Sequence, residues 1–150
     1  MISNDIHATI EVLSQGVIEG LNILGIEAEY KSSKGIFICG RKISGSASAV
    51  KRGFFFIHGT LLISSDLTIL LEVLNAAPRR MKRGVRSIPQ NVTNLEVELG
   101  RKISVSEVKE AVKKGFERAY RTKLITGELN VKEVLLAQTM LMEKYVLEKV

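Results

Sequence analysis

Lys42 is the residue of this sequence whose neighbours best suit it to act on a ligand. It is followed by a run of small residues, Ser44, Gly45, Ser46 and Ala47. Small side chains leave the backbone open to a ligand, and a lysine amine beside them is a compact cation for a phosphate or a carbonyl oxygen. On general frequencies, a single lysine in a basic protein is more often a solvated strand residue. The run alone leaves both interpretations open.

A second candidate is a basic cluster between two apolar segments. Its five cations fall within eight residues: Arg79, Arg80, Lys82, Arg83 and Arg86. They could bind nucleotide phosphates or a nucleic-acid backbone, and Gly84 would let a loop fold over the ligand. The alternative is a solvated helix face, which is the usual role of a charge run. No aromatic residue lies among these cations, which argues against nucleic acid as a partner because base stacking would be missing.

Other reactive residues are few. His58 follows three phenylalanines and precedes Gly59 and Thr60, a setting more typical of a core or turn histidine than of a general base. The single cysteine, Cys39, permits no internal disulfide and no cysteine-cluster metal site, and we interpret it as a small buried hydrophobe on a strand. The sequence contains no P-loop, GxGxxG, HExxH or GxSxG motif.

The composition predicts one cytoplasmic globular domain over residues 1–150. Apolar residues make up 45% of the chain and charged residues 25%, the balance of a folded protein. No apolar run approaches the roughly 18 residues of a membrane span, and the residues after Met1 do not resemble a signal peptide. The net charge of +6 and the pI near 9.6 favour an anionic partner.

The elements that must position these residues follow the order helix, strands, helices, which is the α+β class. Apolar residues at steps of three and four predict the first helix, which Gly25 ends. Asp66 and Asn130 are predicted N-caps, and Ser104 with Glu107 forms a predicted capping box. The predicted elements are a helix over 6–24, three or four antiparallel strands within 26–64, helices over 66–77 and 104–120, a short strand over 123–126, and a helix from 130.

Four segments together resemble the second half of a lipoate-protein ligase. They are RKISGSA (41–47), RGFFFIHGTLLISSDL (52–67), RGVRSIPQNVTNL (83–95) and MEKY (142–145). Their order and spacing agree with that family, and RKISGSA with HGTLL at this separation is the most specific part. The resemblance covers residues 5–145 and implies a mainly antiparallel sheet flanked by helices, part of the class II synthetase-like biotin/lipoate ligase fold.

Ligases of this family activate lipoate with ATP to lipoyl-adenylate and transfer the acyl group to a lysine of an acceptor lipoyl domain. Carried over by match, Lys42 contacts the acyl carbonyl and the adenylate phosphate, where a fixed cation would neutralise developing charge. The resemblance implies ATP, lipoate and Mg²⁺ as ligands. It places Ser44, Gly45, Ser46 and Ala47 on a strand beside the acyl-adenylate, and His58, Gly59 and Thr60 in a turn that closes the pocket. It assigns the adenylate-covering loop to Arg83, Gly84, Val85, Arg86, Ser87 and Ile88.

The sequence departs from the family in three ways. Family members carry an upstream RRxxGGGxVxHD signature that builds the acyl tunnel and much of the nucleotide site, and this sequence has no GGG. Pro89 and Asn91 stand where relatives often have arginines, and the tryptophan common after KY is missing. Without part of the sheet, apolar strand edges should need another chain to cover them. We therefore expect one half of a split ligase, inactive alone, whose N-terminal half is a separate polypeptide; a homodimer through the same surface is the alternative.

Other functions stay open. Octanoyltransferases of this fold work through a cysteine acyl-enzyme and would need a cysteine near 75–78, where the sequence reads NAAP. Biotin ligases share a glycine-lysine strand, but HGTLL and VTNL favour lipoate. A non-catalytic subunit that binds an acyl carrier or regulates a partner is favoured by the missing signature and opposed by the intact RKISGSA. A basic nucleic-acid module ranks last.

Overall fold

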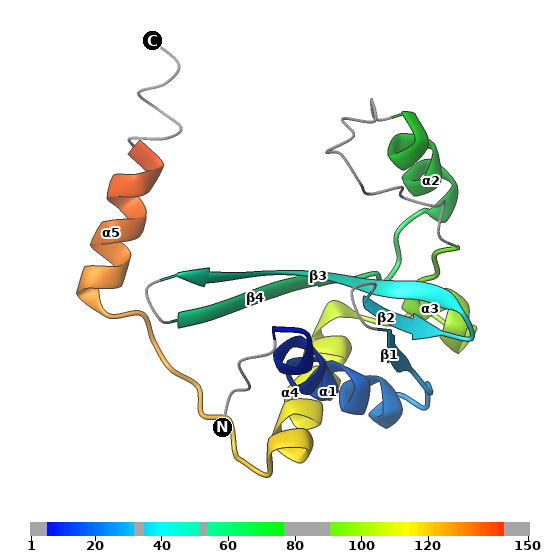
Figure 1. Ribbon diagram of the computed structural model, residues 1–150, viewed down its shortest axis with the longest axis horizontal. Helices are drawn as coiled ribbons and strands as arrows, with labels where there is room; N and C mark the ends of the chain where they lie inside the picture. The colour runs from blue at the N-terminus through cyan, green and yellow to red at the C-terminus, as the bar shows by residue number, and fades with distance from the viewer. Residues whose placement is uncertain (1–5, 32–34, 52–53, 77–90, 143–150) are drawn as a thin grey trace.

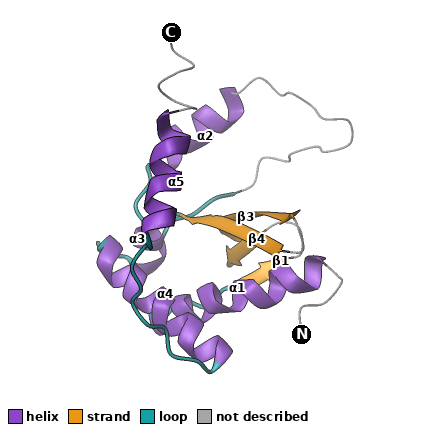
Figure 2. Cartoon of the chain, turned by 90° about the vertical axis from the view of Figure 1, so that its left-hand side faces the viewer, coloured by secondary structure: helices purple, strands orange, loops and turns teal. Residues whose placement is uncertain are grey.

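The computed structural model describes residues 6–31, 35–51, 54–76 and 91–142, and it has the expected α+β class. Figures 1 and 2 show a central sheet with α1 and α4 side by side on one side and with α2 and α5 beyond the other. The elements are α1 (Ile6–Ile23), β1 (Glu29–Lys31), β2 (Gly35–Ile38), β3 (Arg41–Lys51), β4 (Phe54–Leu61), α2 (Leu67–Ala76), α3 (Leu95–Leu99), α4 (Val105–Tyr120) and α5 (Val131–Leu141).

The sheet is a meander in which each strand is antiparallel to the next, in the order β1-β2-β3-β4. A tight turn of Cys39 and Gly40 joins β2 to β3, between the paired residues Ile38 and Arg41. Cys39 has φ 46° and Gly40 has φ 77°, the positive values of a type I′ hairpin turn. The interpretation of Cys39 as a buried strand residue is therefore wrong, because the turn leaves its side chain exposed.

A β-bulge in β3 sets the register near Lys42. Ile36 pairs with Ser44 while Phe37 pairs with Lys42, so β3 carries one extra residue, Ile43, opposite the Ile36–Phe37 step. Ile43 is fully buried, with 0% of its surface exposed. An extra residue shifts the alternation of side chains between the two faces of a strand. Lys42 consequently lies on the same face as Gly45 rather than on the opposite one.

The core packs the sheet against helices through apolar residues of α1, β2, β3, α3 and α4. Leu21 of α1, Ile43 of β3 and Leu95 of α3 are each fully buried. Burial of a side chain of this size stabilises the folded chain by about 1.5–3 kcal/mol. The cluster is formed by Ile18, Leu21, Ile26, Ile36, Ile38, Ile43, Leu95, Ile103 and Val108.

Glycines let α1 and α4 approach each other closely. A Cβ on Gly20 would lie 2.8 Å from the Val112 Cα, and one on Gly115 would overlap backbone atoms of Gly16 and Gly20. The far end of the contact is held by Tyr120, whose hydroxyl donates to the Val12 carbonyl at 2.8 Å. Partial burial raises the pKa of the Tyr120 phenol, which is protonated at neutral pH in any case and stays a donor further into the alkaline range.

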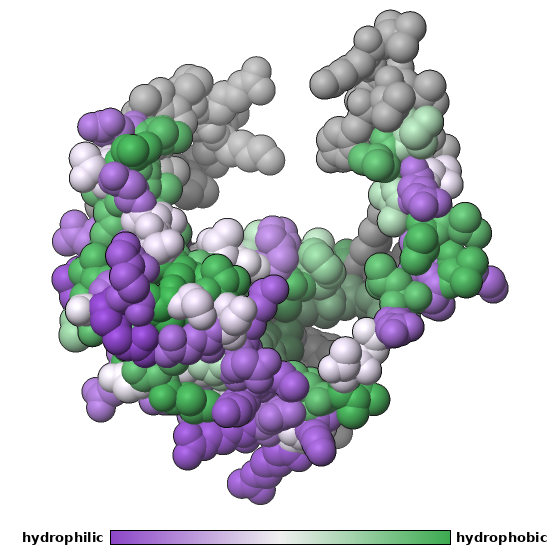
Figure 3. All heavy atoms as spheres, turned by 180° about the vertical axis from the view of Figure 1, so that it is seen from behind, coloured by the Kyte–Doolittle hydropathy of each residue, from purple (hydrophilic) through white to green (hydrophobic). Residues whose placement is uncertain are grey.

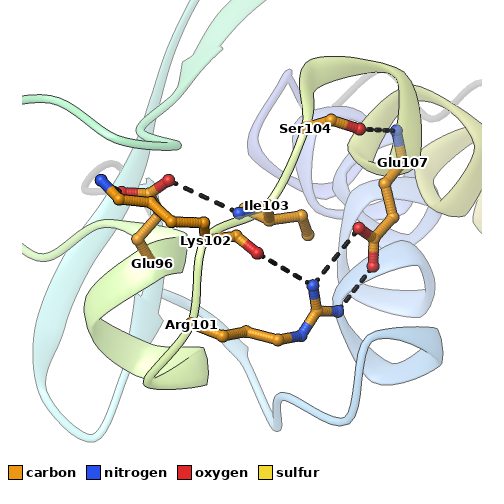
Figure 4. A network of polar contacts seen from close by, with 6 residues as sticks. All are labelled: Glu96, Arg101, Lys102, Ile103, Ser104 and Glu107. Carbon is orange, nitrogen blue, oxygen red and sulfur yellow. Dashed lines mark hydrogen bonds and ion pairs between the residues drawn. The ribbon is translucent and has the colours of Figure 1, made fainter.

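The connection from α3 to α4 is held by ion pairs (Figure 4). Arg101 contacts the Glu107 carboxylate at 2.5 Å, and Lys102 contacts Glu96 at 2.9 Å. The hydrogen bond from Arg101 lowers the pKa of Glu107, and the one from Lys102 lowers the pKa of Glu96. Ser104 caps α4 as predicted, accepting a hydrogen bond from the Glu107 N–H at 3.1 Å. The predicted capping box is only half formed, because the Glu107 carboxylate accepts hydrogen bonds from Arg101 instead.

Most of the predicted boundaries are confirmed. Asp66 accepts hydrogen bonds from the first turn of α2, and Asn130 forms a capping box with Glu133 at the start of α5. The strand predicted over 123–126 is wrong: these residues are exposed, and within the described chain no strand lies beside them to complete a ladder. The short helix α3 was not predicted. No helix among the described residues has the length and apolar character to cross a membrane.

Candidate active site

The predicted site residues of β3 and β4 lie around one cavity of about 410 Å³. Its volume is within the range of small-molecule sites, about 300–1,000 Å³. The predicted residues among its lining are Lys42, Gly45, Ser46, Ala47, His58, Gly59 and Thr60. Residues 83–88, predicted to cover an adenylate, lie outside the described residues. Ser44 is on β3 and pairs with Leu61, but it is not part of the lining.

Strand pairing brings the two predicted segments together. Gly45 pairs with Thr60 and Ala47 pairs with His58, and because side chains alternate along a strand these pairs share one face of the β3–β4 hairpin. His58, Gly59 and Thr60 were expected in a turn, but they belong to strand β4. The turn prediction is wrong because all three residues pair with β3, and this ladder keeps the chain extended.

Two glycines make room for the Lys42 side chain. A Cβ on Gly35 would lie 3.2 Å from the Lys42 Cε, and a Cβ on Gly45 would lie 3.5 Å from Cε and 3.7 Å from Nζ. Gly35 also has φ 112°, a conformation that other residues rarely adopt. Gly35 and Gly45 therefore leave space for the lysine amine at the cavity that Ala47, His58 and Thr60 also line.

The backbone of Lys42 is fixed by a segment distant in sequence. Its N–H donates to the Asn91 carbonyl at 2.8 Å, and its carbonyl accepts from the Thr93 N–H at 2.9 Å, which makes a parallel bridge to Val92. Asn94 then caps α3 and donates from its side chain to the Ser65 carbonyl at 2.8 Å. The VTNL stretch thus ties the lysine strand to the end of the β3–β4 hairpin. In the sequence, this stretch could have been found from its capping asparagine, which a short run of apolar and acidic residues follows.

Two neighbouring cations, Arg41 and Lys42, lie at this end of β3 and differ in their partners. Arg41 pairs with Glu98 at 2.9 Å, and Thr93 also donates a hydrogen bond to that carboxylate. No carboxylate of the described residues lies within ion-pair distance of the half-buried Lys42 amine. A cation at a cavity, with its neighbour already neutralised, is available to hold an anionic or carbonyl oxygen.

Three lining residues were not singled out by sequence reasoning: Ile10 of α1, Tyr30 of β1 and Gly35 of β2. Ile10 and Tyr30 each fitted an apolar periodicity, which marks a packed side chain without telling a core position from a cavity wall. Gly35 preceded a strand, where a glycine usually indicates a turn. Among the described residues, no three His, Cys, Asp or Glu side chains are grouped so that they could hold a metal ion.

A comparison with protein-family models identifies the family of this chain. The model of the lipoyl protein ligase A/B catalytic domain matches residues 2–117. The chain belongs to this family. This confirms the prediction, made from RKISGSA, HGTLL and VTNL, that the chain is related to lipoate-protein ligases.

Curated relatives include both transferases and ligases. Octanoyltransferase LipM of Carboxydothermus hydrogenoformans is 29% identical over 150 residues, covering 89% of this chain and 56% of the relative. Lipoate-protein ligase 1 of Staphylococcus aureus is 28% identical over 131 residues, covering 87% of this chain and 37% of the relative. The chain thus spans about half the length, or less, of these relatives.

Solved structures agree on the fold. The Thermoplasma acidophilum protein Ta0514 with bound lipoic acid superposes with a TM-score of 0.74 at 24% identity, covering 95% of this chain and 57% of that one. A lipoate-protein ligase A bound with ATP gives a TM-score of 0.73 at 24% identity, covering 94% and 57%. A bi-partite lipoate protein ligase from T. acidophilum gives 0.77 at 25% identity, covering 97% and 57%. The predicted fold class, an antiparallel sheet with helices of the lipoate ligase type, is confirmed.

Proposed function

We propose that this chain is one part of an ATP-dependent lipoate-protein ligase that forms lipoyl-adenylate and transfers the lipoyl group to a lysine of a lipoyl domain. The second part is a separate polypeptide with an RRxxGGGxVxHD-type segment. The observation that carries the proposal is the Lys42 amine, which lies at a cavity and faces no carboxylate of the described residues. Lipoic acid and ATP bound to similar structures support the choice of substrates.

The hairpin face suits an acyl group attached to a charged head. Beyond Gly45 and Ala47, the same face of β3 carries Ala49, which pairs with Phe56 of β4. Small side chains on β3 next to a large one on β4 form an apolar strip that leads away from the lysine. An acyl chain along this strip would place its carbonyl and the adenylate phosphate at Lys42. There the amine would stabilise charge that develops on both oxygens.

ATP and Mg²⁺ would reach this site together. Mg²⁺ usually keeps several waters and binds through substrate phosphates with only one or two carboxylates. Among the described residues no three His, Cys, Asp or Glu side chains form a group that could hold a metal ion by themselves. Nucleotide contacts from residues 83–88 stay a prediction, because that stretch lies outside the described residues.

An octanoyltransferase is the second candidate, since curated relatives bear that name. A thioester mechanism needs a thiol at the acyl carbonyl. The single cysteine of this sequence, Cys39, is in the β2–β3 turn and is not part of the cavity lining. Activation by ATP requires no thiol, so the position of Cys39 favours the ligase.

The test is acyl transfer by the assembled enzyme. The chain is co-expressed with the polypeptide encoded beside it that carries an RRxxGGG-type segment. Lipoylation of an apo lipoyl domain is then measured with lipoate and ATP, without ATP, and with an octanoyl carrier protein as the acyl donor. We expect transfer that needs ATP and falls at least 100-fold in Lys42→Ala. Lys123→Ala, which removes an exposed lysine from the loop before α5, is the matched control and should transfer normally.

The outcomes separate the candidate functions. Transfer from the octanoyl carrier without ATP would identify an octanoyltransferase instead. A stable pair without transfer under either condition would indicate a non-catalytic subunit that binds an acyl carrier or regulates its partner. Equal transfer by Lys42→Ala and the parent would refute the role of the lysine.

A further inference from the structure

The outer edge of β4 lacks the features that normally protect a strand edge. β4 is eight residues long and is last in the sheet order, so among the described residues no strand pairs with its outer side. Its sequence, FFFIHGTL, contains no lysine, arginine, carboxylate or proline. Exposed edges with these properties pair readily with other strands. We therefore expect another strand to pair with the outer edge of β4.

The opposite edge of the sheet shows the contrast. β1 has three residues, and two of them, Glu29 and Lys31, form an ion pair at 2.7 Å. Short edge strands with charged residues are the usual protection against unwanted pairing. Only the β1 edge is thus protected. We therefore expect another strand to pair with the β4 edge and not with the β1 edge.

The backbone of β4 offers donors and acceptors at regular intervals on its open side. The Leu62 N–H donates to the Ile43 carbonyl at 3.0 Å, in line with the pairing of Gly45 with Thr60. In an antiparallel ladder only alternate residues bond to the neighbouring strand. That order directs the N–H and C=O groups of Phe56 and His58 toward β3. It directs those of three residues outward: Phe55, Ile57 and Gly59.

Large apolar side chains lie beside this edge. Phe54 is 77% exposed and Phe56 is 62% exposed, on the face that also carries the cavity residue His58. The Phe56 and His58 rings lie 5.7 Å apart, so the apolar surface is continuous with the cavity wall. Figure 3 shows a broad hollow between the α2 and α5 arms at the hairpin. Two exposed phenylalanines at a substrate cavity indicate a face that another polypeptide covers.

We propose that the β4 edge, from Phe55 to Gly59, accepts a strand of the polypeptide that carries the RRxxGGG-type segment, and that this polypeptide covers Phe54 and Phe56. The inference rests on the proposed split ligase and adds where and how its two parts join. The solved structures of this fold have chains of which this one covers 57%, so those chains contain further polypeptide beyond the part that this chain matches. Strand addition would extend the sheet and close the open side of the acyl strip at the same time.

The experiment is hydrogen exchange at single amides by NMR, on the labelled chain alone and in the complex with the co-expressed RRxxGGG-type polypeptide. The outward amides of Phe55, Ile57 and Gly59 should exchange at least tenfold more slowly in the complex. The inward amides of Phe56 and His58 serve as controls within the same strand, because their bonds to β3 exist in both states. Unchanged exchange at the outward amides in a saturated complex would overturn the proposal. So would protection of those amides in the chain alone that rises with its concentration, since a second copy would then cover β4.

A substitution series tests the apolar cover independently. Phe54→Glu with Phe56→Glu should weaken association with the RRxxGGG-type polypeptide at least tenfold. Val105→Glu is the control: Val105 is also exposed and apolar, but it begins α4, where an acidic residue is tolerated. Equal weakening by both variants, or by neither, would overturn the proposed surface.

The failure of this inference can be told from failure of the proposed function. Lys42→Ala removes the amine but no backbone group of β4, so it should abolish transfer and leave the amide protection intact. Protection without transfer in the parent complex would support the interface and reject the ligase. Transfer without protection would support the ligase and reject the interface.

Discussion

Replacement of Gly35 by alanine should destabilise the fold through two separate effects at the lysine site. Gly35 has φ 112°, and forcing an L-residue into a left-handed conformation costs about 1–2 kcal/mol. Its new Cβ would also overlap the Ser44 carbonyl oxygen, a backbone atom of the neighbouring strand. Overpacking of this kind costs about 1–3 kcal/mol. We expect a total loss of about 2–5 kcal/mol in the free energy of unfolding, a large share of the roughly 5–15 kcal/mol that stabilises a typical domain.

Gly40→Ala provides a matched control in the same hairpin. Gly40 has φ 77°, but a Cβ there would meet no heavy atom within 4 Å. This variant should lose only the conformational contribution, about 1–2 kcal/mol. The difference between the two variants therefore measures the contact of Gly35 with Ser44.

The assay is urea unfolding of the parent and both variants in the complex with the RRxxGGG-type polypeptide and, where it is soluble, in the chain alone. The extra loss in Gly35→Ala should lower the midpoint by roughly 1 M beyond the control, since slopes are about 1–3 kcal/mol/M. A loss no larger than that of Gly40→Ala would refute the reasoning, because the overlap with Ser44 would then cost nothing.

Three further substitutions test the packing and the ion pairs. Gly115→Ala should cost about 1–3 kcal/mol in urea unfolding because α1 and α4 must separate, whereas Gly127→Ala, in open space, should stay within about 0.5 kcal/mol; equal losses would contradict the close helix contact. Arg101 lowers the pKa of Glu107, so this pair contributes stability above the unfolded pKa, near 4.3, that disappears as the pH falls through the lower folded pKa. Glu107→Gln should therefore shift the urea midpoint at pH 7 but not at pH 2–3, and a shift that persists in acid would count against the pairing. Tyr120→Phe removes the hydrogen bond to α1 and should cost about 0.5–1.5 kcal/mol, which calorimetry would detect; no change would show that water replaces the bond.

Much of the fold and family could be read from short-range patterns. Helix caps at Asp66, Ser104 and Asn130 were predictable because a capping side chain bonds to backbone two or three residues away. The strand meander followed from alternation and turn residues, and RKISGSA with HGTLL was specific enough to indicate the family. Lys42 was singled out by the small residues that follow it, and its proposed catalytic role came from the resemblance to the ligase family.

Other features depended on groups that meet only in the folded chain. The bulge at Ile43 changes which residues share a face with Lys42, and no local pattern in β3 reveals it because the partner is in β2. The bond from Lys42 to Asn91 spans nearly fifty residues of sequence, so its register is a product of tertiary packing. Cys39 was misassigned because its exposure depends on a turn of two positive-φ residues, only one of which is glycine.

The sequence by itself determined the family, the α+β class, the β-strand meander between α1 and α2 and the identity of the candidate lysine, because each is encoded by residues close together in the chain. Tertiary structure alone decided that Ile10, Tyr30 and Gly35 join the lysine at one cavity. It also decided that β4, rather than β1, is the unprotected edge. An edge is defined by the strand that is not beside it, and strand neighbours are set by long-range pairing that local sequence does not specify.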